Sequence, residues 1–269
     1  MYLTLILINK IAIISTYLIY LYVIIDSITL LRNSVYFTKG MPFSFDILSK
    51  NYRINRIKSR YITKLFVDSI FKFSIYLRIL VVLFLLSSGS MKIFFLLFIL
   101  QIYSYYRNFI LMNAADKFSI TIFLSLSIFW ITNDLNIKSV ALLYTGVIST
   151  FSYVFAAYHK IISPMWRNGK GLSGLFKTEY YGSSTLLKLS NNIFYCQLLS
   201  WGTIIFQFSA VIALLSTTYC LVFGVLSSLF HIFNSVALKI RGFFLVFSAT
   251  LPCIYYASTV IVDFINISK

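Results

Sequence analysis

Eight apolar runs, each about as long as a helix that crosses a lipid bilayer, dominate this chain. A membrane-spanning helix needs about 20 predominantly apolar residues, because the hydrocarbon core is ~30 Å thick and a helix rises ~1.5 Å per residue. Only 11% of the residues are charged, whereas soluble domains carry about 25%. The sequence therefore predicts an all-α fold, a polytopic integral membrane helical bundle of about eight transmembrane helices. The expected spans are 11–31, 65–88, 93–112, 118–133, 140–160, 192–216, 219–237 and 243–262.

These spans leave no room for a separate soluble domain, so residues 1–269 are expected to form a single transmembrane domain. No small-residue cleavage pattern follows the first span, and we expect it to be a retained helix and not a removable signal. The expected location is the cell membrane, as a multi-pass protein. Cys196, Cys220 and Cys253 lie in expected spans without CxxC spacing, which favours buried apolar side chains over a disulfide or a zinc site. No metal is expected.

The net charge of +16 comes mainly from loops between the apolar runs. In a soluble protein this charge would favour nucleic acid as a partner. Here contact with anionic lipid headgroups and the signal for membrane insertion explain it more simply, and no nucleic acid is expected. Loops on one side of the predicted bundle carry 17 basic residues against four on the other, which predicts that loops 32–64 and 160–191 face the cytoplasm. The second half of loop 32–64 is expected to form a basic amphipathic helix on the membrane surface.

Polar groups within the expected spans are the first candidates for a functional site, because a charge at the centre of a span costs ~2.5–3.5 kcal/mol on insertion scales. Arg107 and Asp116 flank a short turn that contains Asn113; an ion pair across the turn, with a cap, is the structural interpretation. His231 lies deep in an apolar span. A lone histidine there is usually a neutral, hydrogen-bonded packing residue, and a catalytic role is the alternative. For Gln207, the structural interpretation is a hydrogen bond to a neighbouring helix.

Lys160 ends the apolar stretch YVFAAYHK, and in a helix Tyr153 and Ala157 lie on the same face as its side chain. The structural interpretation is that the stem lies along the span while the ammonium reaches the interface. The functional alternative is a desolvated lysine that acts as a base. The structural interpretation of Trp166 is an anchor at the membrane interface, and Pro164 is expected to end the helix.

Four segments carry a family resemblance. Residues 153–169, YVFAAYHKIISPMWRNG, have the form Y-F-x-A-G-x-x-K followed closely by W-x-x-G. YFTKGMP at 36–42 is similar to a Gly-x-x-Pro segment, YYRNFILMNAADKF at 105–118 to an R-N…D turn, and FHIFNSVALKIRGFF at 230–244 to a late histidine helix. Taken in the order in which they occur along the chain, these four segments resemble the vitamin K-dependent gamma-carboxylase-like membrane domain, also called the horizontally transferred transmembrane domain. The resemblance covers residues 10–262.

The resemblance implies roles for the matching residues. Lys160 matches the lysine proposed as the active-site base of the carboxylases, which deprotonates a reduced quinone, and His231 matches the histidine of the late helix. These two are the expected catalytic residues. Two positions depart from the pattern: Ala157 stands in place of Gly, and Gln207 stands where many members have Glu. The residues expected to shape the pocket are Arg107, Asn113, Asp116, Tyr153, Trp166, Gly169 and Gln207.

The carboxylases also need a large extramembrane domain for their substrate, so glutamate carboxylation is not expected from this short chain. The chain is most similar to compact, basic bacterial members of the sporulation-delaying protein B type, which act with a small partner in maturing a secreted peptide toxin. The leading expectation is therefore an integral membrane maturation factor for an exported antimicrobial peptide, with a small partner protein and the toxin precursor as partners. In the carboxylases the lysine works on the extracytoplasmic side, opposite to the orientation that the loop charges predict, and both orientations stay open.

Two alternatives remain. One is a membrane enzyme that acts on a quinone or lipid, with Lys160 as base. The other is a non-catalytic membrane scaffold or an immunity-type protein, in which only packing and loop contacts matter.

Overall fold

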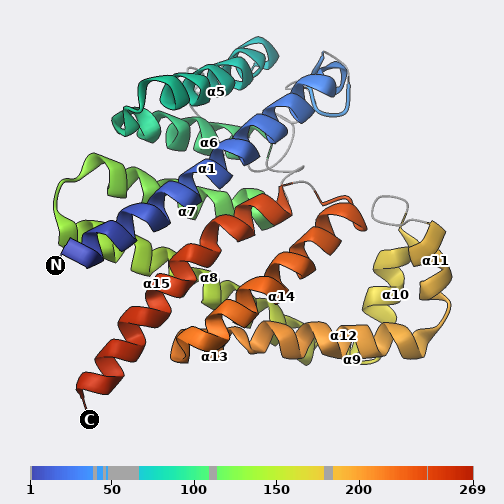
Figure 1. Cartoon of the computed structure of the whole chain (residues 1–269). Coiled ribbons are helices and arrows are strands. Elements are labelled where there is room, and N and C mark those ends of the chain that lie inside the picture. Colours follow the sequence, from blue (N-terminus) through green and yellow to red (C-terminus); the bar gives the residue numbers. More distant parts are fainter. Residues whose placement is uncertain are drawn as a thin grey trace. The chain divides into compact units, whose positions relative to one another are not determined.

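The regular secondary structure is all helical in the part of the chain that the structure, a computed structural model, describes: residues 2–38, 41–44, 47, 67–108, 114–178, 184–240 and 242–268. No strand occurs among these residues, which confirms the predicted all-α class. The helices (Figure 1) are α1 (Tyr2–Arg32), α5 (Asp68–Ser88), α6 (Phe94–Asn108), α7 (Ala114–Ile131), α8 (Leu135–Ile162), α9 (Pro164–Arg167), α10 (Lys170–Lys177), α11 (Ser184–Ser190), α12 (Ile193–Phe208), α13 (Ala210–Leu215), α14 (Thr217–Val236) and α15 (Phe243–Ile267), with 3-10 turns at Ser34–Phe37 and Met91–Ile93.

Seven helical segments of the described chain are long and apolar enough to cross a membrane, as in a multi-pass membrane protein. They are Leu5–Arg32, Asp68–Ser88, Ala114–Ile131, Leu135–Ile162, Ile193–Leu215, Thr217–Val236 and Phe243–Ile267. The remaining predicted span, 93–112, corresponds to α6, of which the structure describes 15 residues, Phe94–Asn108; residues 109–112 lie outside the described part of the chain. The amphipathic helix expected in the second half of loop 32–64 lies outside the described residues.

The predicted span 192–216 is interrupted once. α12 ends at Phe208 and α13 begins at Ala210, with Ser209 between them. The Ser209 hydroxyl donates to the carbonyl of Phe206 at 2.7 Å. A serine hydroxyl that bonds back to the preceding turn competes with the backbone ladder and bends helices. The interruption comes two residues after Gln207, one of the predicted site residues.

The chain divides into two compact units. The C-terminal unit consists of Met1–Leu18 and Thr132–Lys269, and the N-terminal unit of Ile19–Ile131. The single domain expected over residues 1–269 stays a prediction. In the N-terminal unit, α6 packs against both α5 and α7. Aromatic contacts fill this packing, including Phe37 with Phe71 at 5.1 Å and Phe94 stacked on Phe123 at 5.7 Å between ring centroids.

In the C-terminal unit, α15 packs against both α8 and α14, and α12 packs against α8. The contact of α8 with α15 relies on small residues. Ala249, Cys253 and Ala257, spaced by four along α15, are all buried. A Cβ placed on Gly146 of α8 would lie 2.2 Å from the carbonyl oxygen of Cys253. Helices in a bilayer gain most of their association from such close backbone approach, because lipid supplies no hydrophobic drive between them.

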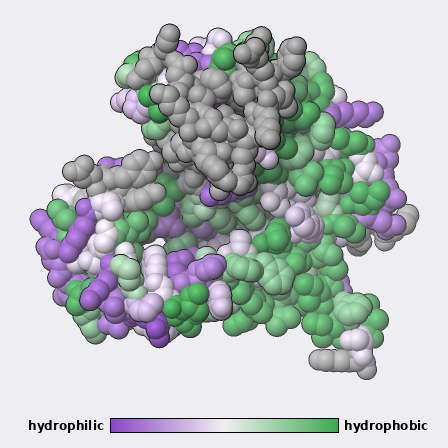
Figure 2. Space-filling view, turned by 180° about the vertical axis from the view of Figure 1, so that it is seen from behind, coloured by the Kyte–Doolittle hydropathy of each residue, from purple (hydrophilic) through white to green (hydrophobic). Residues whose placement is uncertain are grey.

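The outward faces of the long helices are apolar, as a surface that contacts lipid must be. On α14, Leu221, Val225 and Leu229 recur every four residues and are each about three-fifths exposed. Figure 2 shows extended hydrophobic surface over the long helices. A soluble monomer does not expose apolar surface on this scale.

The α8–α15 contact generates a prediction. Gly146→Ala should lower the free energy of unfolding by about 1–3 kcal/mol, the usual range for overpacking, because the added methyl meets a backbone carbonyl. Gly224→Ala on α14 is the matched control, since its added Cβ has no atom within 4 Å and alanine favours a helix. Thermal unfolding in detergent measures both. Equal unfolding temperatures for the two variants would contradict the close contact.

Candidate functional site

The predicted site residues that the structure describes fall into two groups, one in each unit. Lys160 and His231 belong to the C-terminal unit, together with Tyr153, Trp166, Gly169 and Gln207. Arg107 and Asp116 belong to the N-terminal unit. Asn113 lies outside the described residues.

Uncharged groups surround Lys160 at the end of α8. Its Nζ donates to Gln207 Oε1 on α12 at 3.0 Å and to the Ala156 carbonyl at 3.2 Å. The same Nζ lies 5.1 Å from the ring centroid of Trp166, within cation–π range. Among the described residues, no carboxylate lies within 4 Å of this amine. The amine is therefore bound to protein, and the described part of the chain gives it no counter-charge.

Two local features bring Trp166 over the amine. α8 ends at Ile162, Ser163 is extended, and Pro164 starts α9, where its missing N–H costs no hydrogen bond. Gly169 then takes a left-handed conformation, with φ +76°, before α10 begins. A Cβ on Gly169 would lie 2.5 Å from the Gln197 amide nitrogen, so only glycine allows this turn to lie against α12. The W-x-x-G spacing thus has a structural reason.

Tyr153 and His231 form a second polar contact in the same unit. The Tyr153 hydroxyl lies 2.6 Å from both Ser227 Oγ and His231 Nε2, one turn apart on α14. His231 is 2% exposed, and its ring stacks on Phe247 at 4.4 Å. Its Nδ1 has no hydrogen-bond partner among the described residues. This geometry fits a packed, hydrogen-bonded histidine better than a base open to substrate.

α12 links the two contacts. Tyr153 and Lys160 are seven residues apart on one face of α8, about 10 Å along the helix axis. The ring of Phe206, next to Gln207 in the sequence, lies 6.2 Å from that of Tyr153. The C-terminal unit therefore places Tyr153, Lys160, Gln207 and His231 on neighbouring faces of α8, α12 and α14.

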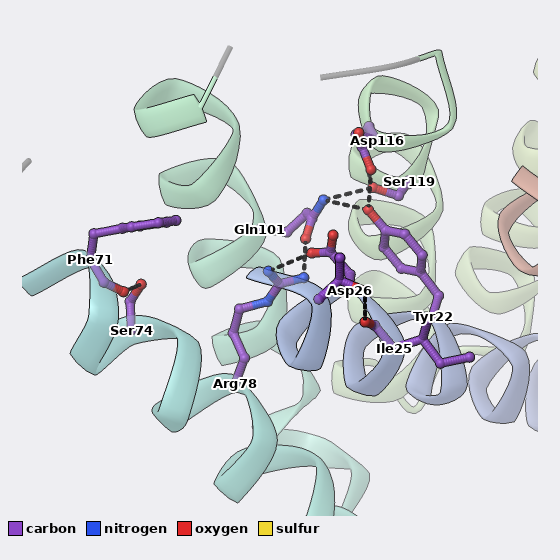
Figure 3. A network of polar contacts seen from close by, with 10 residues as sticks. Tyr22, Ile25, Asp26, Phe71, Ser74, Arg78, Gln101, Asp116 and Ser119 are labelled. Atoms are coloured by element: carbon purple, nitrogen blue, oxygen red, sulfur yellow. Dashed lines mark hydrogen bonds and ion pairs between the residues drawn. The ribbon is translucent and has the colours of Figure 1, made fainter. Parts of the chain in front are cut away.

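The N-terminal unit holds a hydrogen-bonded network that joins four helices (Figure 3). Arg78 of α5 is 1% exposed, and donates to Asp26 Oδ2 of α1 and to Gln101 Oε1 of α6, both at 2.9 Å. Gln101 Nε2 donates to Ser119 Oγ of α7 at 2.8 Å. The Tyr22 hydroxyl of α1 donates to Asp116 Oδ1 at 2.7 Å. A buried guanidinium is stable only with such partners, because its desolvation costs several kcal/mol.

Arg107 forms a separate ion pair at the end of α6. Its side chain is fully buried, and its NH2 group donates to Asp68 Oδ1 of α5 and to the Phe43 carbonyl, the latter at 3.2 Å. Its guanidinium carbon lies 5.2 Å from the ring centroid of Phe71. The sequence predicted a pair with Asp116 across the turn; the ion pair seen here joins Arg107 to a different helix.

The sequence did not point to several polar residues of the N-terminal unit. They are Tyr22, Asp26, Gln101 and Ser119 of the four-helix network and Asp68, the partner of Arg107. A usable signal was present for two of them. The chain has only seven acidic residues, and Asp26 and Asp68 lie in or at the start of apolar runs that face runs containing arginine. Pairing each intramembrane acid with each intramembrane base would have suggested them.

A metal centre has no ligand set in the described part of the chain. There, no three His, Cys, Asp or Glu side chains gather closely enough to hold a metal ion. The cysteines are all buried as free thiols.

The four-helix network predicts strong coupling between Arg78 and Asp26. Asp26→Asn should cost about 3–5 kcal/mol of unfolding free energy, because it leaves a buried guanidinium without its counter-charge. Asp26→Leu combined with Arg78→Met should recover much of that loss. Asp263→Asn, at an exposed position on α15, is the control. Single and double losses that simply add in a double-mutant cycle would refute the coupling.

The Tyr153 contact gives another prediction. Tyr153→Phe keeps the ring but removes the hydroxyl, and leaves Ser227 and His231 without their shared partner. The expected loss is about 1–3 kcal/mol of unfolding free energy. Tyr158→Phe, at an exposed position on the same helix, should change stability by less than ~0.5 kcal/mol. Thermal unfolding of both variants in one detergent distinguishes them, and similar losses would argue against a structural role for the hydroxyl.

Comparison with protein-family models, with curated proteins and with solved structures gave no match to this chain. The family resemblance of the four segments stays a prediction, and the candidate site depends on its own geometry.

Proposed function

We propose that this chain is an integral membrane maturation factor for an exported antimicrobial peptide, acting with a small partner protein at a site centred on Lys160. The four ordered segments support the class of function through their resemblance to the sporulation-delaying protein B type. The observation that carries the proposal is the environment of Lys160. Trp166, which matches the W-x-x-G segment, lies over the amine, and Gly169 of the same segment fixes the turn that carries Trp166.

The same environment favours a second candidate, a membrane enzyme that acts on a quinone or a lipid. A general base must be able to lose its proton, and no described carboxylate holds Lys160 in its charged form. In this function Lys160 takes a proton from the substrate. Gln207 orients the amine through its carbonyl oxygen, and Tyr153 with His231 fixes the neighbouring faces of α8 and α14.

Variants of Lys160 test whether the amine is needed. In a strain that lacks the gene, complementation with Lys160→Met or Lys160→Arg should lower the output of active peptide by ~10²-fold or more, because neither side chain can act as a base. Lys92→Met, which removes an exposed lysine that belongs to neither polar group, is the control and should restore normal output. Peptide activity in the medium is measured alongside membrane abundance of each variant.

The outcomes separate the candidate functions. Full activity of the secreted peptide in the deletion strain would refute the maturation role. If Lys160→Arg restores output and Lys160→Met does not, the function needs the positive charge of Lys160 and not its ability to accept a proton. Restoration by both would favour a scaffold or immunity-type protein. Quinone or lipid that is retained by the purified wild type and lost from Lys160→Met would favour the enzyme.

A further inference from the structure

A basic layer covers the end of the C-terminal unit where α8 finishes and α12 starts. It consists of α9, α10 and α11, and we call it the basic cap, defined by the exposed side chains Arg167, Lys170, Lys177 and Lys188. Among the described residues of this segment, 163–178 and 184–192, there is no acidic residue. Figure 2 shows hydrophilic surface gathered over this end, at the left of the view.

The fold directs these charges outward. On α10, Leu172 and Phe176 are buried against Leu186 and Cys196 in one apolar cluster. Lys170 and Lys177 are seven residues apart, on one face of the helix and away from that cluster. The glycine turn at Gly169 holds the start of α10 against the backbone of α12. The basic side chains are thus presented by a packed element.

The cap lies between two candidate membrane spans. One ends at Ile162 of α8 and the next begins at Ile193 of α12, so a bilayer that both cross has its surface at the start and the end of the cap. Large apolar side chains are exposed beside the charges, with Met165 at 59%, Leu187 at 49% and Phe194 at 66%. Exposed apolar groups alternating with lysine and arginine are typical of segments that lie in the headgroup layer.

We infer that the basic cap binds the phosphate groups of anionic phospholipids in the leaflet that it contacts. Attraction to anionic lipid is strong within about one Debye length, ~8–10 Å, of the headgroups, and the position of the cap between two candidate spans brings its charges to that layer. A soluble acidic partner must instead compete with this surface. The inference uses neither Lys160 nor any reaction, so it is independent of the proposed function.

Lipid-dependent stability of the full purified chain tests the inference. Dioleoylphosphatidylglycerol should raise the unfolding temperature in detergent more than dioleoylphosphatidylcholine does. Lys170→Gln with Lys177→Gln should lower that difference, and adding Arg167→Gln and Lys188→Gln should lower it further. The matched control, Lys10→Gln with Lys92→Gln, removes two exposed lysines outside the cap. It should leave the difference between the two lipids unchanged. About 0.5 M NaCl, with a Debye length of roughly 4 Å, should suppress the difference in the wild type.

Native mass spectrometry of the wild type supplies a readout that needs no variant to fold. More phosphatidylglycerol than phosphatidylcholine should be retained from an equimolar mixture. Equal retention, or a fourfold cap variant with the full phosphatidylglycerol effect, would overturn the inference. So would an equal shift from inorganic phosphate alone, which would exclude a need for a lipid headgroup. A shift with polyglutamate but not with phosphatidylglycerol would assign the cap to an acidic protein partner instead.

Discussion

The buried guanidinium of Arg78 determines how the helices of the N-terminal unit meet. An apolar helix can turn any face toward its neighbours at little cost, but an arginine inside it must find an anion and further acceptors. Asp26 supplies the anion from α1, and Gln101 supplies the acceptor from α6. Because Gln101 also bonds to Ser119, the position of α7 follows from the same charge. Rotating any of these four helices would leave a buried polar group unsatisfied, so the network specifies one arrangement among many apolar ones.

The C-terminal unit reaches a defined arrangement by different means. Its main contact, between α8 and α15, depends on the missing side chain of Gly146 and the small residues opposite it. Hydrogen bonds of neutral groups, such as that of Tyr153 with His231, add direction to this packing. The half-buried amine of Lys160 is stabilised by an amide oxygen, a backbone carbonyl and an aromatic ring. These groups hold the amine in place without neutralising it.

The helices were predictable from the sequence, whereas most polar contacts were not, because those contacts depend on how the helices pack. Span length and apolarity are local properties, so all eight predicted runs correspond to helices. Lys160 and Gln207 were both singled out because each is a polar group in an apolar run, although their hydrogen bond was not predicted. The partner of Arg107 was missed because Asp116 lies closer in sequence, whereas Asp68 is brought to it by the packing of α5 on α6. Tyr22 and Ser119 gave no signal, since such residues are common in apolar helices and gain meaning only from their partners.

The scarcity of acid makes the environment of Lys160 informative. The chain carries 23 basic and seven acidic residues. The structure uses Asp26 and Asp68 for arginines and Asp134 to cap α8. Gln207 already reaches the Lys160 amine, so a glutamate at that position would have formed an ion pair without any change of fold. Lys160 instead bonds to glutamine, the uncharged counterpart of glutamate. A lysine without a counter-ion costs stability, and such a lysine is suited to react or to bind a ligand.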